Sequence, residues 1–334
     1  MEARFKVVVI VLAVVSATFG IFGIRDLDNV PYSGFFTGPT NEITRVFPGS
    51  PAESAGLEVG DVLQSVDGIS LSDTRALARR ERPALGETRM FMVDRDGGEV
   101  ELAVTYSGQP EVNRTTSWLG LVVGLCFLAF PMWAYVKAPS AANRVLALFG
   151  LCFGAAFTPG PYSSSYFLRT LGGSIGTTAV VLGFAFLVHF VLLFPRPRPF
   201  LDRPSANKII YWPAIGLAAF FLYLTVFTPD TTDMLGQVIG LMAGIFIVSF
   251  FGWAVVAMIQ TYNRATAEER SRYGLTQMLI GTLVGLVPLT LANLIGSVAP
   301  AVQANLPGVQ FYFLGLGLIP LTFAMSAAKA SAAE

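Results

Sequence analysis

The chain has 334 residues, of which 53% are hydrophobic and only 13% are charged, and its formal net charge is zero. Soluble domains carry about 25% charged residues, so much of this protein is expected to face lipid. Residues 25–114 hold nine Arg against fifteen Asp or Glu, and this acidic island excludes nucleic-acid binding and a basic lipid-docking patch.

The first predicted element is an apolar run over residues 7–24. Its eighteen residues are enough to span a hydrocarbon core. A secretory signal peptide is the alternative, with Val15-Ser16-Ala17 as its cleavage site. The run continues beyond that site, which favours an uncleaved anchor helix over residues 1–25.

The polar island begins with a short helix signal. Ser50 and Glu53 have capping-box spacing, and Pro51 falls at the first helical position, where its missing N–H costs nothing. Gly56 fits the left-handed position that closes such a helix, and Leu57 follows as its apolar contact. A one-turn helix is therefore predicted here.

Two hairpins and a second helix follow. Asp67-Gly68 predicts a tight turn after a strand at residues 62–66, and Asp96-Gly97-Gly98 predicts a closing hairpin. Between them, a helix is expected over residues 74–82, where Pro83 ends it.

The string Pro48-Gly49-Ser50-Pro51 to Gly60-Asp61-Val62-Leu63 resembles the signature of bacterial PDZ domains, and residues 42–47 resemble the strand that enters it. The resemblance implies an α/β PDZ domain over residues 30–108. Such domains add an extended peptide as a strand to a sheet edge, and backbone amides hold its terminal carboxylate.

By this resemblance, the expected ligand-binding residues form a carboxylate loop and a groove helix: Tyr32, Ser33, Gly34, Phe35, Phe36, Thr74 and Leu77. Gly34 allows the backbone to approach the carboxylate, while Phe35 and Phe36 are expected to place an apolar wall beside the last side chain of the ligand. The implied partner is therefore the C-terminus of a peptide or protein.

Seven further apolar segments follow, at about residues 117–136, 145–158, 176–195, 209–227, 235–260, 274–296 and 309–328. The bundle they form is expected over residues 116–329. With the anchor, the sequence predicts a multi-domain protein: an α-helical polytopic membrane bundle of eight spans with an inserted α/β PDZ domain.

Loop charges orient this arrangement. With the N-terminus inside, the inner side receives twelve Lys or Arg, whereas the short outer loops receive only Arg169. The positive-inside rule then predicts both termini in the cytoplasm and the PDZ domain outside. The expected location is the bacterial inner (cytoplasmic) membrane, with the bilayer as a further partner.

The whole arrangement resembles the input region of competence-type sensor histidine kinases and related membrane sensors. Their His-x-x-x-x-Phe-Pro pattern is similar to His189–Pro195, with one extra residue, and their Pro-x-x-Phe-Ala pattern matches residues 320–324. Such sensors continue into an enzymatic domain, whereas this sequence stops at Glu334. The resemblance therefore implies a cytoplasmic signalling partner or an effector domain that is missing here.

No catalytic constellation is expected, and no cofactor or metal. A single histidine excludes the His-Glu-x-x-His zinc motif. The string Gly172-Gly173-Ser174-Ile175-Gly176 fits Gly-x-Ser-x-Gly, but His189 lies about 22 Å further along the same helix. The chain is therefore predicted not to be an enzyme.

Three polar residues within the spans are candidates for function: His189, Asn293 and Gln310. For His189, a functional role and an interhelical hydrogen bond both stay open. Asn293 and Gln310 are expected either to line a cavity open to the outside or to make ordinary interhelical bonds.

These observations predict a membrane sensory or regulatory module. Its PDZ domain binds peptide or protein termini and couples to a cytoplasmic signalling partner. The alternative is a protease-associated membrane adaptor that presents or tethers substrates. A transporter is disfavoured, because the spans lack internal charge and show no inverted repeat.

Overall fold

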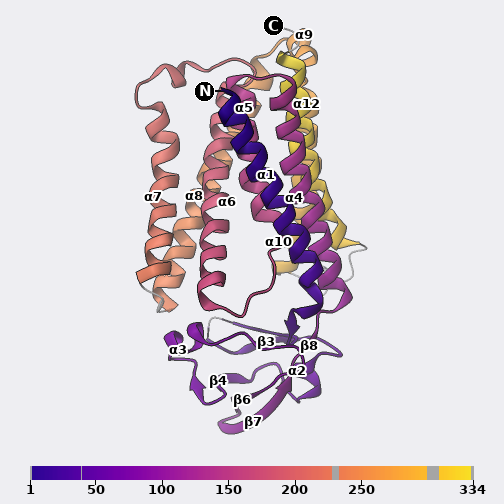
Figure 1. Cartoon of the computed structure of the whole chain (residues 1–334), viewed down its shortest axis with the longest axis vertical. Coiled ribbons are helices and arrows are strands. Elements are labelled where there is room, and N and C mark those ends of the chain that lie inside the picture. The colour runs from indigo at the N-terminus through magenta and orange to yellow at the C-terminus, as the bar shows by residue number, and fades with distance from the viewer. Residues whose placement is uncertain (1, 39, 228–232, 299–307, 332–334) are drawn as a thin grey trace.

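The computed structural model describes residues 2–38, 40–227, 233–298 and 308–331. It consists of a bundle of long helices with a small α/β region at one end (Figure 1). The first helix begins and the last helix ends at the opposite end of the bundle, so the N- and C-terminal segments lie together, far from the α/β region.

Among the described residues, the α/β region contains three small sheets. In the largest, the strand order is β5-β4-β6-β7, while β1 pairs with β8 and β2 pairs with β3, all antiparallel. The strands are β1 (Pro31–Tyr32), β2 (Phe35–Thr37), β3 (Ile43–Val46), β4 (Val62–Val66), β5 (Ile69–Ser70), β6 (Thr88–Arg95), β7 (Gly98–Thr105) and β8 (Ser107–Gly108). Two short helices, α2 (Pro51–Ser54) and α3 (Thr74–Arg79), complete the region.

Buried and exposed side chains alternate along the strands, and the buried ones form the core of this region. In β6, Phe91 and Val93 are buried while Met90 is exposed, as expected for a strand with one face against a core. They pack with Ile43 and Val104 from neighbouring strands. The core thus joins segments as far apart in the sequence as Ile43 and Val104.

The local signals of the sequence are confirmed. Ser50 Oγ accepts a hydrogen bond from Glu53 N at 3.2 Å, and Gly56 has a φ of +84°, where glycine closes α2. The Glu53 carboxylate accepts from Gly49 N, one residue earlier than in a standard capping box. Asp67-Gly68 and Asp96-Gly97 both have two positive φ values, as two-residue hairpin turns require.

Helix α3 is shorter than expected. The Asp73 side chain caps it by accepting from Ala76 N, but the helix ends at Arg79 instead of Arg82. Arg80 is already extended, and its side chain is paired with Asp67 and bonded to the Val66 carbonyl. These contacts with the β4–β5 turn end the helix before Pro83 does.

The remaining elements are helical. They are α1 (Glu2–Arg25), η1 (Asp26–Asn29), α4 (Glu111–Lys137), α5 (Ala141–Phe157), α6 (Tyr166–Leu193), η2 (Pro199–Asp202), α7 (Ala206–Phe227), α8 (Asp233–Arg264), α9 (Ala267–Arg272), α10 (Leu275–Val298), η3 (Val309–Gly317) and α12 (Leu318–Ser331). Among the described residues, seven helices are long and apolar enough to cross a membrane. The chain is therefore a multi-pass membrane protein.

The expected count of eight spans is corrected to seven. The segment expected at residues 145–158 is helix α5, whose 17 residues cover about 25 Å, less than the roughly 30 Å of a hydrocarbon core. Ser140 caps its start, and Thr158 is extended because Pro159 follows it. The α/β region is also not an insertion within the run of helices: it lies near the N-terminus, after α1 alone.

The capping box of Thr266 and Glu269 is present, but it begins a separate short helix, α9. Gly274 has a φ of +64°, which interrupts the helical conformation before α10 begins at Leu275. Helix α9 is therefore separate from α10 and lies at the end of the bundle.

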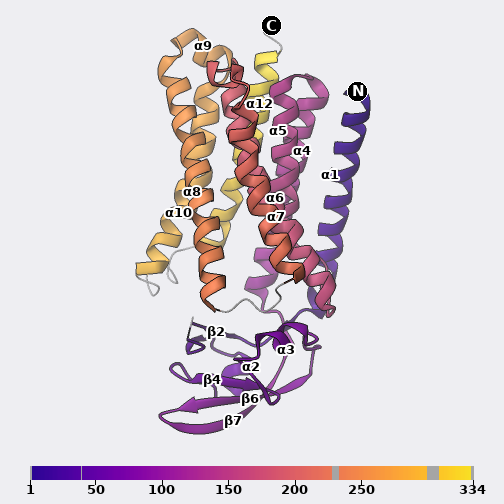
Figure 2. The same cartoon turned by 90° about the vertical axis from the view of Figure 1, so that its left-hand side faces the viewer.

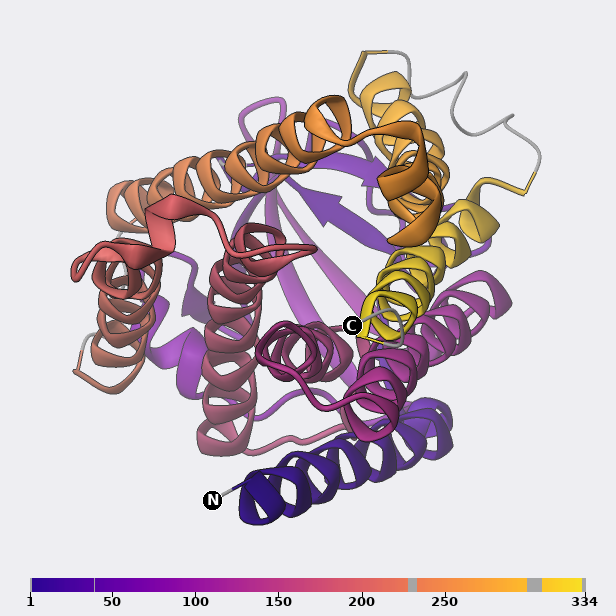
Figure 3. The same cartoon turned by 90° about the horizontal axis from the view of Figure 1, so that it is seen from above.

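Close packing of α4 and α5 depends on small residues. A Cβ on Gly150 would lie 2.3 Å from the Phe127 carbonyl oxygen, and one on Gly154 would lie 2.5 Å from the Leu128 side chain. Seen from above, α1 lies on the outside of this pair, and α7 and α8 form the opposite side of the bundle (Figure 3).

Candidate functional site

Strand β2 is an open sheet edge. Among the described strands it pairs with β3 alone, through Phe35 opposite Val46 and Phe36 opposite Arg45. β3 is joined on its other side to β4 by the bridge from Glu42 to Val62. The second edge of β2 is therefore unpaired, which is the feature that strand addition requires.

The loop that enters β2 turns two backbone carbonyls inward. Ser33 O accepts from Ala52 N at 2.9 Å, and Gly34 O accepts from Phe47 N at 2.9 Å and from Ser50 Oγ at 3.2 Å. In a trans peptide the N–H points opposite to the C=O. The Gly34 N–H therefore points away from α2, and the Phe35 N–H points away from β3, toward the open edge. Successive amides of this kind are the donors of an anion-binding nest.

Glycine is needed at position 34 for this arrangement. Its φ is +86°, and a Cβ there would lie 2.1 Å from the Ser50 Cβ. Ser50 is buried, and its hydroxyl joins the loop to the first turn of α2. The start of α2 and the carboxylate loop are thus joined through the Ser50 hydroxyl.

The two phenylalanines of the loop do not form a single wall. The Phe35 ring packs edge-on against Phe91 in the core, at 5.7 Å between centroids. The Phe36 side chain points to the other face of the strand, where it is 57% exposed and contacts Phe47. Alternation along β2 separates them, so only Phe35 lies on the core side of the edge.

Arg45 is a charged neighbour of the loop that the sequence did not reveal. It lies opposite Phe36 on β3, and its guanidinium carbon is 4.6 Å from the centre of the Phe47 ring. Burial raises the pKa of Tyr32, and the Arg45 charge partly offsets that rise, which places the charge beside the loop. Within the described side chains, no carboxylate lies at ion-pair distance from Arg45. Only the register of β2 on β3 identifies it.

The expected groove helix α3 lies with β2 on the side of the α/β region that faces the bundle, while β6 and β7 lie farther away (Figure 2). Leu77 is half-buried in α3. Thr74 begins this helix, but its side chain falls outside the described residues.

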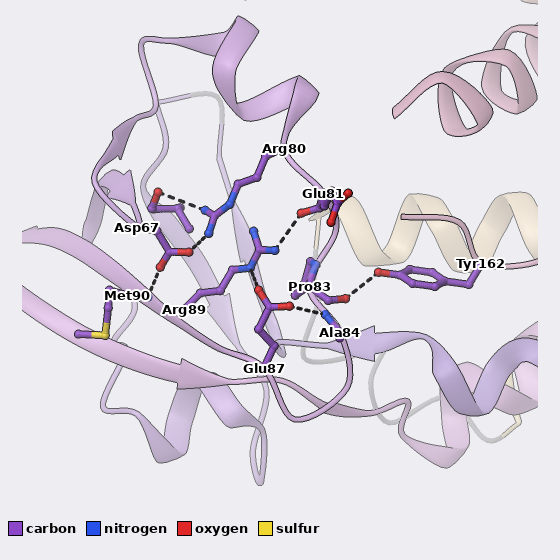
Figure 4. A network of polar contacts seen from close by, with 10 residues as sticks. Asp67, Arg80, Glu81, Pro83, Ala84, Glu87, Arg89, Met90 and Tyr162 are labelled. Carbon is purple, nitrogen blue, oxygen red and sulfur yellow. Dashed lines mark hydrogen bonds and ion pairs between the residues drawn. The ribbon is translucent and has the colours of Figure 1, made fainter. Parts of the chain in front are cut away.

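A polar network holds the segment that follows α3 (Figure 4). Arg80 is paired with Asp67, while Arg89 donates to Glu81 O and to Glu87 Oε1, both at 2.8 Å. Glu87 also accepts from Ala84 N, and this bond together with the Arg89 guanidinium holds the pKa of the Glu87 carboxyl below its usual value. The segment is therefore fixed to both β4 and β6.

The bundle contacts this same segment. The Tyr162 hydroxyl, between α5 and α6, donates to Pro83 O at 2.7 Å, and Arg169 in α6 donates to Arg80 O at 3.2 Å (Figure 4 shows the first bond). The Arg82 guanidinium lies 5.8 Å from the Tyr162 ring centre. We call residues 80–83 with Tyr162 and Arg169 the docking contact.

The three polar candidates within the helices are not brought together in one site by any contact among the described residues. His189 Nδ1 lies 2.6 Å from the Tyr211 hydroxyl, so it makes an interhelical bond from α6 to α7. Asn293 donates to Leu289 O in its own helix. Gln310 is in η3, and its side chain lies outside the described residues. Among the described residues, no group of three or more His, Cys, Asp or Glu could hold a metal.

Comparison with known proteins agrees with this geometry. Residues 42–81 match the PDZ domain family. The chain carries a PDZ domain. The rabbit (Oryctolagus cuniculus) Na(+)/H(+) exchange regulatory cofactor NHE-RF2 is 41% identical over 59 residues, which are 17% of this chain and 19% of that protein. The chain thus covers about a fifth of this relative. A PDZ domain implies binding of peptides or protein termini.

Proposed function

We propose that this protein is a membrane sensory or regulatory module. Its PDZ domain captures the C-terminus of a peptide or protein at the open edge of β2, and the helices pass this occupancy to a cytoplasmic signalling partner. The unpaired edge of β2 is the observation that carries the proposal, together with the carbonyl bonds that turn the N–H groups of Gly34 and Phe35 away from α2 and β3. No reaction is assigned to the chain.

The energetics favour a free carboxylate as the bound group. A hydrogen bond to a charged group is worth about 1.5–3 kcal/mol, more than one to a neutral amide. Arg45 adds a positive charge beside the loop, with no carboxylate among the described side chains to neutralise it. Phe35 points to the core face of β2 and Phe36 to the opposite face. An apolar side chain of the ligand would therefore lie on the core face, beside Phe35.

The docking contact supports coupling to the helices. A ligand strand beside β2 would lie on the same side of the domain as α3, and the chain continues from α3 directly into residues 80–83. Tyr162 and Arg169 bind two carbonyls of that segment. A shift of α3 on binding would therefore reach the start of α6 through two hydrogen bonds.

Loop charge supports an orientation with the PDZ domain outside the cell. Basic residues gather at the end of the bundle where α1 begins and α12 ends, for example Arg198, Arg264 and Lys329. We extend the proposal to a bacterial inner membrane with both termini in the cytoplasm, as in competence-type sensor kinases. Helix α5 is too short to count as a span by length, but the start of α1 and the end of α12 still lie at the same end of the bundle (Figure 1).

Peptide binding by the full chain in a neutral detergent tests the proposal. Fluorescent peptides that end in an apolar residue should bind with roughly micromolar affinity. Amidation of the peptide terminus should weaken binding about tenfold, and Arg45→Gln should weaken binding of the free-acid peptide severalfold. Arg114→Gln, which removes an arginine charge from an exposed pair with Asp28, is the matched control.

If amidation changes nothing, terminal-carboxylate capture is wrong, and the domain is a spacer or a protein-contact module. The alternative role, a protease-associated adaptor, uses the same edge to present or tether substrates. A protease that copurifies with the intact protein would favour the adaptor, and a cytoplasmic signalling protein would favour the sensor.

A further inference from the structure

One stripe of helix α8 lines three cavities in succession, running toward the end of the bundle farthest from the PDZ domain. Its members recur every three or four residues and therefore share one face: Ile247, Phe251, Ala254, Met258, Thr261 and Arg264. From the first to the last, this stripe covers about 26 Å at 1.5 Å per residue. The cavities differ sharply in chemistry along that length.

The innermost cavity is apolar and lies among α4, α5, α6, α8, α10 and α12. Its volume is about 320 Å³, and its walls include Phe153, Phe184, Phe251 and Phe323. The polar side chain in this lining is Thr282, whose hydroxyl already donates to Met278 O at 2.9 Å. At about 30 Å³ per group of the size of a water molecule, the cavity holds about ten methylene groups.

The outermost cavity is basic. It measures about 200 Å³ and is lined by Arg196, Arg198, Arg264 and Glu269, together with Tyr273. Glu269 pairs with Arg196 at 3.2 Å. Among the described side chains no other carboxylate lines this cavity, so it holds two more positive than negative charges.

Arg198 is held in place by neutral acceptors. It donates to Gln260 Oε1 at 2.9 Å, to Thr261 Oγ1 at 2.7 Å and to Ala257 O. Burial and the nearby Arg264 charge lower the pKa of the Arg198 guanidinium. Two arginine charges thus line one cavity at the end of α8, where an anion would relieve their repulsion.

A third, very small cavity, here called the neck, lies between the two. Its volume is about 10 Å³, and it shares Val191 and Met258 with the apolar cavity and Thr261 with the basic one. Met258 and Met278 line it, and unbranched methionine side chains change rotamer readily. At about 10 Å³ the neck is closed to a hydrocarbon chain, so passage of a chain requires these two side chains to move.

We propose that the three cavities bind one amphiphile with a single long apolar chain and an anionic head group. The head, a phosphate or a carboxylate, lies between Arg198 and Arg264, and the chain passes the methionine neck into the phenylalanine-lined cavity. Charge complementarity selects the head, and the absence of free polar groups in the described lining of the inner cavity selects the chain.

Native mass spectrometry of the full chain, released from a neutral detergent, tests this site. Dodecyl phosphate is the probe; inorganic phosphate and dodecanol represent its head and its chain alone. One molecule of dodecyl phosphate should be retained, with at least tenfold higher occupancy than either of the other two. A photoreactive group at the end of the chain should label Phe251 or its neighbours in the inner cavity.

Two pairs of variants localise the binding. Arg264→Gln should lower retention of dodecyl phosphate about tenfold, whereas Arg203→Gln, a nearby arginine outside the cavity, should not. Ala254→Phe should block the inner cavity, whereas Val248→Phe on the exposed face of α8 should not.

The three probes distinguish an amphiphile site from a free-anion site and from a purely apolar cavity. Equal retention of inorganic phosphate would show a free-anion site only, and equal retention of dodecanol would show an apolar cavity only; either result overturns the proposal. Unchanged binding in Arg264→Gln also overturns it. If Ala254→Phe does not fold, photolabelling of residues outside the inner cavity would contradict the placement of the chain.

Discussion

The Tyr162 hydroxyl donates a 2.7 Å hydrogen bond to the Pro83 carbonyl, and this bond joins the helix bundle to the PDZ domain. Pro83 lies just beyond α3, the helix expected to close the peptide groove. Tyr162 N also donates to Asp26 Oδ2 at 2.6 Å, next to the end of α1. The loop before α6 therefore contacts both the PDZ domain and the residues that follow α1.

Tyr162→Phe should loosen the PDZ domain on the bundle. The substitution leaves the Pro83 carbonyl without this donor, a loss of about 0.5–1.5 kcal/mol. Spin labels at Glu101→Cys and Ile175→Cys, with Cys126 and Cys152 replaced by alanine, should give a broader distance distribution than in the parent. Tyr166→Phe, at the start of α6, is the control and should leave the distribution unchanged; equal broadening in both would contradict the role of Tyr162.

Gly56→Val should unfold the PDZ domain while the bundle stays intact. A β-branched residue at a φ of +84° stores strain of order 1–3 kcal/mol, which is a large share of the stability of a small domain. Limited trypsin digestion should then cut within residues 30–108. Gly108→Ala is the matched control, because the nearest atom to its new Cβ is 3.9 Å away. Unchanged resistance in Gly56→Val would show that Gly56 does not limit stability.

Asp61 should give the PDZ domain a pH-dependent stability. The Arg95 guanidinium bonds both carboxylate oxygens, at 2.7 and 2.8 Å, and with the Glu58 N–H it lowers the pKa of Asp61 in the folded state. The stabilisation is therefore fully present above the unfolded pKa of about 3.9 and is lost as the pH falls through the lower folded value.

Hydrogen exchange of β6 and β7, corrected for intrinsic rates, measures this dependence between pH 3 and 6, a range of about three units around the pKa of an unfolded aspartate. Protection should fall at the acid end in the parent, and Asp61→Asn should be less stable with a flatter profile. Glu101→Gln, on the exposed side of β7, should retain the parent profile. A parent profile without any acid decline would contradict the prediction.

The proposed orientation predicts opposite reactivity for two exposed serines. Ser107 belongs to β8 in the PDZ domain, and Ser205 precedes α7 at the other end of the bundle. In intact cells, Ser107→Cys should react with a membrane-impermeant thiol reagent, whereas Ser205→Cys should react only after the membrane is opened. Labelling of Ser205→Cys in intact cells would exclude the proposed orientation.

The sequence by itself determined the short-range features of this protein. Ser50, Pro51 and Gly56 specify α2 because capping and a positive φ act within a few residues, and the Asp-Gly pairs specify their hairpins for the same reason. Long apolar runs likewise identify the spans, since only a helix satisfies its own backbone in lipid. The exception, α5, is short because a cap and a proline bound it more tightly than its hydropathy indicates.

Only the tertiary structure decided which of these elements meet. The register of β2 on β3 places Arg45 beside the carboxylate loop and separates Phe35 from Phe36. The bond from Tyr162 to Pro83 joins residues 79 positions apart, and that from Arg198 to Thr261 joins residues 63 positions apart. Such pairs leave no periodicity or spacing in the sequence, because they depend on how separate helices and strands pack and not on local backbone preference.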